Sequence, residues 1–245
     1  KQIAGAIDKY PVTMHLHKAG PSFFGYYYYN SRQAPIHFNG DDTTVKGAIN
    51  LTAFSSPDAM EFFMFSLNGN MVSGDWKKET DANPLSFTGK ETAGLPLTFV
   101  YTEGEQKLMP QMAESPQATY FAASIWPTGA TELDAFLRKA LVNMYDENAT
   151  ETSIGQLLLR NKEAFFRQYT ADMKDVKPVD FKETSFMYNM DQSQRILLAY
   201  HDNKLATTAN FVYEYSGGAH GNYRTVFTSF DLVGKKVLKL SDVIT

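Results

Sequence analysis

The stretch Ala59–Trp76, AMEFFMFSLNGNMVSGDW, decides the fold of the first part of the chain. Its flanks, Met60–Leu67 and Met71–Trp76, are rich in aromatic, Met and Val residues, which favour strands. They meet across Asn68-Gly69-Asn70, a tripeptide typical of a tight turn. The stretch therefore predicts a β-hairpin.

Further short strands precede this hairpin. In Pro11–His17, the apolar Val12, Met14 and Leu16 alternate with polar residues, as in a strand with one buried face. The other expected strands are Ser22–Tyr29, Pro35–Phe38 and Val45–Phe54, with a turn at Asn39-Gly40. Short strands in series predict an all-β meander or small barrel over residues 1–92.

Residues 93–116 differ from what precedes them, because Gly and Pro punctuate polar sequence there. We interpret them as a connection that contains one short strand, Leu97–Tyr101. A second domain is then expected over residues 117–245. We also expect that the natural protein continues beyond Thr245.

Two helices are predicted after a strand at Ala118–Trp126. The first carries an apolar stripe at helical spacing from Leu133 to Met144, with Thr131 and Asp134 as a capping box at its start. The second carries a similar stripe from Ile154 to Met173, with Ser153 and Gln156 as its capping box. Each helix therefore has one face suited to cover a sheet.

The pattern then returns to strands. They are expected at Thr184–Met190, Arg195–His201, Leu205–Tyr215, Tyr223–Leu232 and Lys236–Leu240, the last two joined by a turn at Val233–Lys235. This order predicts an α+β domain with both helices on one face of an antiparallel sheet. The fold class of the whole chain is thus α+β, with an all-β first part.

Composition limits the function. The formal net charge is −4 and no basic stripe is present, so a nucleic-acid partner is not expected. No apolar run is long enough for a transmembrane helix. Cysteine is absent, which excludes disulfides and a cysteine nucleophile. The chain begins with Lys1, which we interpret as a processed chain whose signal or lipoprotein leader is already removed.

Glu214–Thr225, EYSGGAHGNYRT, is the first candidate site. Its glycines suit a loop between two strands, since glycine adopts positive φ without strain. A catalytic interpretation would join Ser216, His220 and Asp231, but no nucleophile-elbow motif surrounds Ser216. We favour a shaped loop that contacts a partner, with Ser216, Gly217, Gly218, His220 and Asn222 as binding residues.

Two further patterns carry candidate residues. His15 and His17 share one strand face. This arrangement suits either a metal site completed by His37 or Asp41, or two solvated imidazoles. We favour the solvated imidazoles and expect neither a metal nor a cofactor. In Phe23–Tyr29, alternate rings point to opposite faces, so one tyrosine pair, Tyr27 with Tyr29 or Tyr26 with Tyr28, is expected to be exposed. Exposed tyrosines bind sugars or protein partners; the alternative is a sheet covered on both sides.

The segments Tyr213–Gly221, Phe230–Lys236 and Leu238–Asp242 carry the pattern YxGGAHG, FDLxxGK and LxLxD, with one residue fewer than FDLxxGK between Leu232 and Gly234. Over residues 205–245 the chain resembles the C-terminal domain of the RsiV/PdaC-like family. That family includes an anti-sigma factor that binds lysozyme and a peptidoglycan deacetylase in which the domain is non-catalytic. The chain lacks a sigma-binding stretch and the histidine pair of the deacetylase.

The resemblance implies an exported protein of the periplasm or cell surface, with a lipoprotein as one form. It implies a non-catalytic binding module, whose ligand is a lysozyme-like protein or a cell-wall glycan such as peptidoglycan. The alternative is a hydrolase of envelope polysaccharide or peptidoglycan with His220 at its centre. Nothing in the residues favours catalysis over binding.

Overall fold

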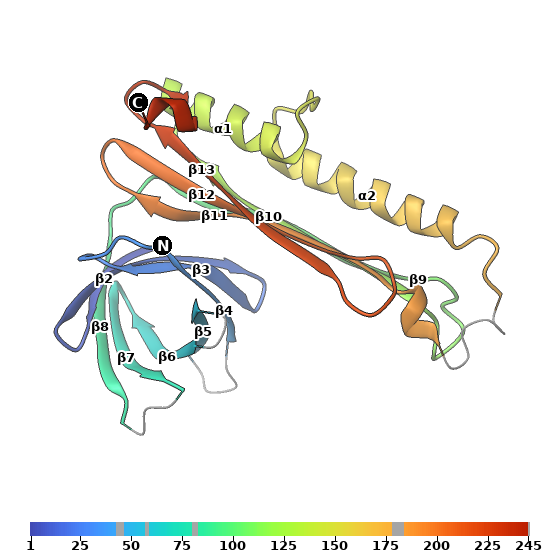
Figure 1. Cartoon of the computed structure of the whole chain (residues 1–245), viewed down its shortest axis with the longest axis horizontal. Coiled ribbons are helices and arrows are strands. Elements are labelled where there is room, and N and C mark those ends of the chain that lie inside the picture. The colour runs from blue at the N-terminus through green and yellow to red at the C-terminus, as the bar shows by residue number, and fades with distance from the viewer. Residues whose placement is uncertain (43–46, 57–58, 80–82, 178–183, 245) are drawn as a thin grey trace. The chain divides into compact units, whose positions relative to one another are not determined.

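The structure, a computed structural model, describes residues 1–42, 47–56, 59–79, 83–177 and 184–244 (Figure 1). The chain divides into two compact units. Unit 1 comprises Lys1–Phe99, Leu197–Thr208 and Ser229–Thr245, and unit 2 comprises Val100–Ile196 and Ala209–Thr228. The strands of one sheet thus contribute to both units, and the boundaries expected at residues 92 and 117 stay a prediction.

Within the described residues of unit 1, eight strands form a closed barrel. They are β1 (Gln2–Ile7), β2 (Tyr10–Ala19), β3 (Ser22–Tyr29), β4 (Ile36–Asp42), β5 (Ala48–Ser56), β6 (Ala59–Asn68), β7 (Met71–Lys78) and β8 (Leu85–Thr92). Each strand pairs antiparallel with the next, and β1 pairs with β8 to close the barrel. The hairpin that the sequence predicts is β6–β7, whose register runs from Glu61 opposite Lys78 to Asn68 opposite Met71. The expected meander or small barrel is confirmed.

Strand alternation fills the barrel interior. Val12, Met14 and Leu16 are buried in its core, as their spacing predicts. Phe63 and Phe65 of β6 point into the same core and meet the ring of Phe87 edge to face, with ring centroids 5.1 and 5.4 Å apart. The interior is therefore packed with aromatic and aliphatic side chains.

The turn expected at Asn39-Gly40 is wrong. Both residues lie inside β4, where Gly40 pairs with Leu51 of β5. A Cβ added to Gly40 would lie 1.8 Å from the carbonyl oxygen of Asn50. The glycine thus allows two strands to approach closely, a role that the dipeptide pattern does not separate from a turn. Val45, where the next strand was expected to begin, lies outside the described residues.

The second sheet has six strands among the described residues, in the order β14-β13-β12-β11-β10-β9. They are β9 (Leu97–Lys107), β10 (Gln117–Pro127), β11 (Met190–His201), β12 (Leu205–Tyr215), β13 (Asn222–Asp231) and β14 (Lys236–Val237). The sheet is mixed, because β10 and β11 are parallel. The expectation of an antiparallel sheet is wrong for this pair, since the two helices between these strands return the chain to the same end.

Both predicted helices are present, α1 (Glu132–Tyr145) and α2 (Ile154–Asp172), and both lie along one face of β10 (Figure 1). Thr131 caps α1 through the expected capping box with Asp134. Ser153 is the N-cap residue of α2, but its side chain makes no capping hydrogen bond. The predicted start of α2 is therefore confirmed, but the predicted capping box with Gln156 is wrong.

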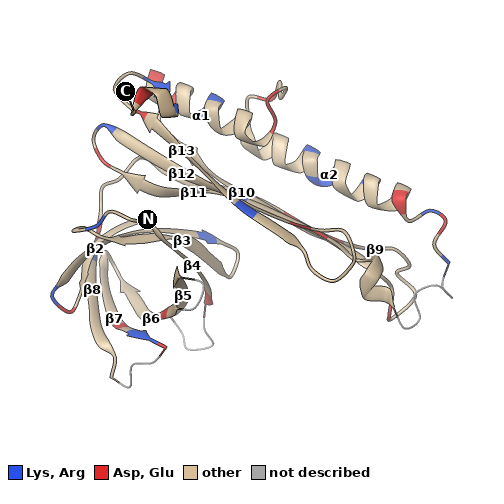
Figure 2. Cartoon of the chain, in the orientation of Figure 1, with Lys and Arg blue, Asp and Glu red and all other residues tan. Residues whose placement is uncertain are grey.

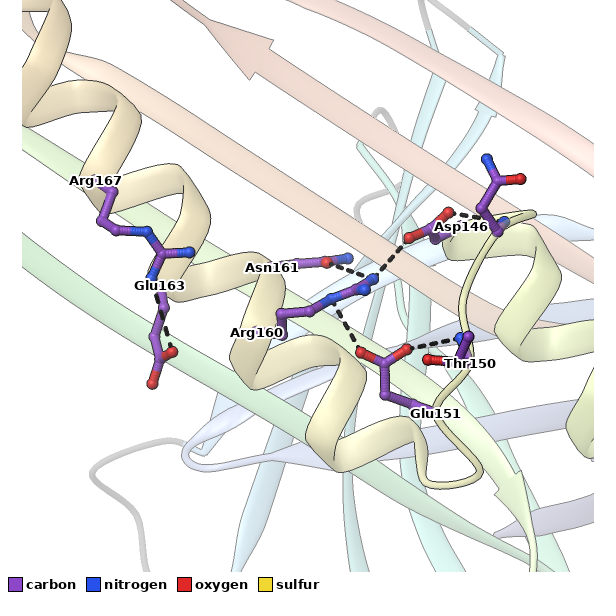
Figure 3. A network of polar contacts seen from close by, with 8 residues as sticks. Asp146, Thr150, Glu151, Arg160, Asn161, Glu163 and Arg167 are labelled. Carbon is purple, nitrogen blue, oxygen red and sulfur yellow. Dashed lines mark hydrogen bonds and ion pairs between the residues drawn. The ribbon is translucent and has the colours of Figure 1, made fainter.

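Arg160 of α2 holds the connection between the two helices (Figure 3). Its guanidinium lies 2.6 Å from Asp146 Oδ2 and 3.1 Å from Glu151 Oε1. Glu151 also accepts a hydrogen bond from the backbone N–H of Thr150. One side chain thereby fixes both ends of the loop between α1 and α2.

The strand expected at Thr184–Met190 is wrong. Ser185–Tyr188 form a short 3-10 helix, η1, and β11 begins only at Met190. At the C-terminus, Leu240–Asp242 form a second one, η2. In the part of the chain that the structure describes, neither α1 nor α2 has the length and hydropathy of a membrane-spanning helix.

Candidate functional site

The loop between β12 and β13 has a fixed shape. Gly217 and Gly218 have φ of +86° and +96°, a region that favours glycine. The hydroxyl of Tyr215 donates to two carbonyl oxygens, that of Gly218 at 2.9 Å and that of Phe186 at 3.2 Å. A Cβ on Gly217 would lie 2.2 Å from the carbonyl oxygen of Met187. The loop therefore packs against η1, beside which it lies in Figure 1.

This packing leaves the polar side chains of the loop in solvent. Ser216, His220 and Asn222 are exposed, and so is the ring of Tyr223 that follows them. The structure thus gives the loop the accessibility that the sequence interpretation requires. A binding role for Ser216, Gly217, Gly218, His220 and Asn222 stays a prediction.

The catalytic alternative needs Asp231 to orient His220. Asp231 Oδ1 instead accepts hydrogen bonds from the backbone N–H groups of Val233 and Gly234, at 3.0 and 2.9 Å. These bonds hold the turn between β13 and β14, as Asp does in many turns. The carboxylate is thus occupied in holding the chain reversal.

An acidic pocket of about 610 Å³ lies in the same unit as the loop. It is lined by Glu103, Gly104, Glu105, Thr119, Tyr120, Phe121, Asp191, Gln192, Ser193 and Tyr213. Glu103 and Glu105 are exposed on β9, and Asp191 of β11 accepts a hydrogen bond from the hydroxyl of Thr119. The lining thus carries three carboxylates and neither Lys nor Arg among the described residues.

The loop and the acidic pocket are contiguous through Tyr213. A Cβ on Gly221 would lie 2.5 Å from Cε2 of Tyr213, so the glycine packs on this ring, and the ring lines the pocket. Apolar side chains flank the loop: Phe186 and Met187 of η1 are 57% and 50% exposed, and Tyr223 is 77% exposed. We call these three residues, the Ser216–Asn222 loop and the acidic pocket together the loop surface.

The expectation of exposed tyrosines on β3 is wrong. Tyr26, Tyr27 and Tyr28 are 3%, 0% and 5% exposed, and Tyr29 is only partly exposed. Tyr27 points into the barrel core, while Tyr28 packs against Tyr200 with ring centroids 5.5 Å apart. The strand is therefore covered on both faces, which leaves Tyr27 inaccessible to a partner.

The expectation of solvated histidines on β2 is also wrong, because His15 and His17 are 1% and 8% exposed. His17 stacks on Phe99, and His15 lies beside Tyr28. Among the described residues no cluster of three or more His, Cys, Asp or Glu side chains could hold a metal ion, so His37 and Asp41 do not complete a site with them.

Sequence reasoning missed the carboxylates of the loop surface. Glu103 and Glu105 lie on one strand, but Asp191 reaches the same pocket because β11 pairs parallel with β10, with Asp191 opposite Thr119. Only the alternation of Glu103 and Glu105 was visible in the sequence. Their proximity to Asp191 depends on the connection through α1 and α2 that makes β11 parallel to β10.

No protein-family model matches the chain, and no curated protein matches it. Solved structures similar to this chain include two proteins of the DUF3298 family. A member of the DUF3298 family from Bacteroides fragilis is 22% identical, with a TM-score of 0.52, over 61% of this chain and 61% of that chain. A DUF3298 family protein from Pseudomonas aeruginosa is 20% identical, with a TM-score of 0.37, over 61% of this chain and 59% of that chain.

The alignment thus spans less than two thirds of each of these proteins. At this identity the likeness to the Bacteroides protein concerns the fold alone. This chain is therefore similar in fold to a protein of the DUF3298 family, a family defined by a domain of unknown function.

Proposed function

We propose that this protein is a non-catalytic binding protein of the bacterial cell envelope, exported to the periplasm or cell surface. Its partner is a basic protein of the lysozyme kind, bound at the loop surface. The resemblance of residues 205–245 to the RsiV/PdaC-like family supports the location and the class of partner. The observation that carries the proposal is the continuity of the shaped, exposed loop with a pocket lined by three carboxylates.

The shape of the loop favours recognition. The hydroxyl of Tyr215 ties the carbonyl groups of Gly218 and Phe186 together, which anchors the loop to η1 before a partner arrives. A loop that is already ordered loses less conformational entropy on binding, which strengthens the association. The exposed rings of Phe186 and Tyr223 are the kind of aromatic anchors that dominate protein interfaces.

The charge of the loop surface selects the partner. Glu103, Glu105 and Asp191 give the pocket a negative potential, which attracts a basic protein and accelerates its approach. A neutral glycan donates hydrogen bonds to such carboxylates but gains no long-range charge attraction from them. We therefore favour a basic protein over a cell-wall glycan, and the hydrolase alternative finds no support in the position of Asp231.

Calorimetry of the whole chain with lysozyme tests the proposal, with an acidic protein of similar size as the negative partner. We expect binding to lysozyme alone. The double variant Glu103→Gln, Glu105→Gln and the single variant Tyr223→Ala should each weaken it about five- to thirty-fold. The matched control is Glu163→Gln, an exposed carboxylate on α2 that pairs with Arg167 (Figure 3).

Three results would overturn the proposal. If the wild type and the Glu103→Gln, Glu105→Gln variant bound lysozyme with equal affinity, the acidic pocket would have no part in binding it. Binding of soluble peptidoglycan fragments, lost in Tyr223→Ala while lysozyme fails to bind, would reassign the loop surface to a glycan. Turnover of such fragments that His220→Ala abolishes would reassign it to a hydrolase.

A further inference from the structure

A row of polar side chains crosses three strands of the barrel in unit 1. Gln2 of β1 lies directly opposite both Thr92 of β8 and His15 of β2. Residues directly opposite each other project from the same side of a sheet. Because the next residues, Ile3 and Met14, point into the barrel core, the Thr92–Gln2–His15 row lies on its outer face.

Four polar atoms of this region are buried yet make no hydrogen bond to any described residue. They are Thr92 Oγ1, Gln2 Oε1, His15 Nε2 and His17 Nε2. A buried polar atom without a partner costs about 1–3 kcal/mol, so native proteins rarely gather several in one place. All four residues line the same pocket, of about 670 Å³. Four polar atoms without a partner among the described residues thus lie in the wall of one pocket.

The rest of the lining is apolar or charge-balanced. Its apolar part includes Leu16 and Phe23 of the barrel, Leu97 and Phe99 of β9, and Leu198 of β11, all in unit 1. Its charged side chains form ion pairs, Lys1 with Glu91 and Lys18 with Asp42. The side-chain charges of the lining thus cancel pairwise, and the N-terminal ammonium of Lys1 donates a hydrogen bond to the carbonyl oxygen of Leu16.

The two imidazoles are also uncharged at neutral pH. Burial, followed by the neighbouring His201 and the N-terminal ammonium of Lys1, lowers the pKa of His15 to about 3. Burial likewise holds the pKa of His17 well below its usual value. A neutral imidazole nitrogen donates or accepts according to its tautomer. The best-suited partner for such a nitrogen is a group that both donates and accepts hydrogen bonds.

We propose that this pocket is a binding site for a neutral small molecule rich in hydroxyl groups, a mono- or disaccharide. A hydroxyl both donates and accepts, so it pairs with the imidazoles, the amide oxygen of Gln2 and the hydroxyl of Thr92. The carbon faces of a sugar ring suit Leu97, Phe99 and Leu198 of the lining. The volume lies within the range of about 300–1,000 Å³ that small-molecule sites have.

The test uses the whole chain and a panel of glucose, N-acetylglucosamine and their disaccharides, with glucose 6-phosphate and glucuronate as charged counterparts. Calorimetry should detect a neutral sugar and neither anion. Thr92→Val, which removes the hydroxyl but keeps the shape, should weaken binding about three- to ten-fold. The matched control is Thr88→Val, because Thr88 lies on the same strand and is exposed.

Nitrogen-15 spectra of the histidine rings give a second readout. The bound sugar should shift the Nε2 signals of His15 and His17 and leave those of the exposed His220 unchanged. The proposal would be overturned if no sugar of the panel bound. It would also be overturned if a sugar bound equally well to Thr92→Val and left the histidine ring signals unchanged. The variant Glu103→Gln, Glu105→Gln should bind the sugar like the wild type, which separates this site from the loop surface.

Discussion

At the scale of the residue, Glu61 explains how the polar end of Tyr27 is accommodated inside the barrel. Its side chain is 3% exposed inside the barrel, where it accepts hydrogen bonds from the hydroxyl of Tyr27 and, at 3.1 Å, from Nε1 of Trp76. Burial, the hydrogen bond to Glu61 and its charge raise the pKa of Tyr27. The three side chains form one buried polar group in an otherwise apolar core.

Removing the acceptor from this group should destabilise the protein. Glu61→Leu removes the carboxylate that accepts from the hydroxyl of Tyr27 and from the indole N–H of Trp76, at a cost of about 2–5 kcal/mol. Glu61→Gln keeps a side-chain oxygen for them and should cost about 1 kcal/mol. Urea denaturation monitored by Trp fluorescence compares the two. Equal stability of Glu61→Leu and the wild type would show that the polar group contributes nothing.

The buried histidines should make stability depend on pH. The unfolded chain binds a proton at each histidine near pH 6.5, whereas folded His15, with its pKa lowered to about 3, does not. Since the unfolded state then binds more protons, the free energy of unfolding should fall as the pH drops from about 6.5, by at most about 1.4 kcal/mol per pH unit for each histidine.

Urea denaturation at pH 7, 6 and 5 measures this dependence. The double variant His15→Gln, His17→Gln should flatten it, and His220→Gln, a substitution at an exposed position, is the matched control. An unchanged slope in the double variant would show that other groups cause the acid sensitivity.

At the scale of the element, the two helices differ in how they begin. Thr131 and Asp134 bond each other's backbone N–H groups at the start of α1, whereas Ser153 makes no such bond at the start of α2. The capping-box sequence pattern is present at both sites. Only the backbone and side-chain conformation at each cap decides whether it is used.

Replacing each cap by alanine should reveal this difference. Thr131→Ala should lower the free energy of unfolding by about 1 kcal/mol, the usual contribution of a side-chain cap. Ser153→Ala should change it by less than about 0.5 kcal/mol. Thermal and urea denaturation of both variants check the prediction, which equal losses would contradict.

At the scale of the whole molecule, charge is dispersed. Figure 2 shows Lys and Arg scattered along the chain, with the formal net charge at −4. The carboxylates that matter for the proposed partner are gathered instead at one pocket of unit 2. A local concentration of negative charge, more than the net charge, should therefore govern association with a basic protein.

Salt should slow that association. Raising the ionic strength from about 0.01 to about 0.1 M shortens the Debye length from about 30 to about 10 Å. The association rate constant with lysozyme should then fall by about ten-fold, and by clearly less for the variant Glu103→Gln, Glu105→Gln. Stopped-flow or surface-binding kinetics measure it. A rate constant independent of salt would exclude electrostatic steering by the acidic pocket.

What the sequence by itself determined is local. The hairpin at Asn68–Asn70, the alternation of Val12, Met14 and Leu16, and the capped stripe of α1 follow from the periods of 2 and 3.6 residues and from turn and cap chemistry. The α+β class follows from their order. The loop candidate was also visible, because glycines between two strands signal a shaped connection.

Only the tertiary structure decided which faces are covered and which distant side chains meet. Alternation placed His15 and His17 on one face, but their burial depends on Phe99 and on strand β11, far along the chain. The acidic pocket depends on the parallel pairing of β10 with β11. The physical reason is that periodicity specifies which side chains share a face, whereas burial and proximity depend on contacts between segments remote in sequence.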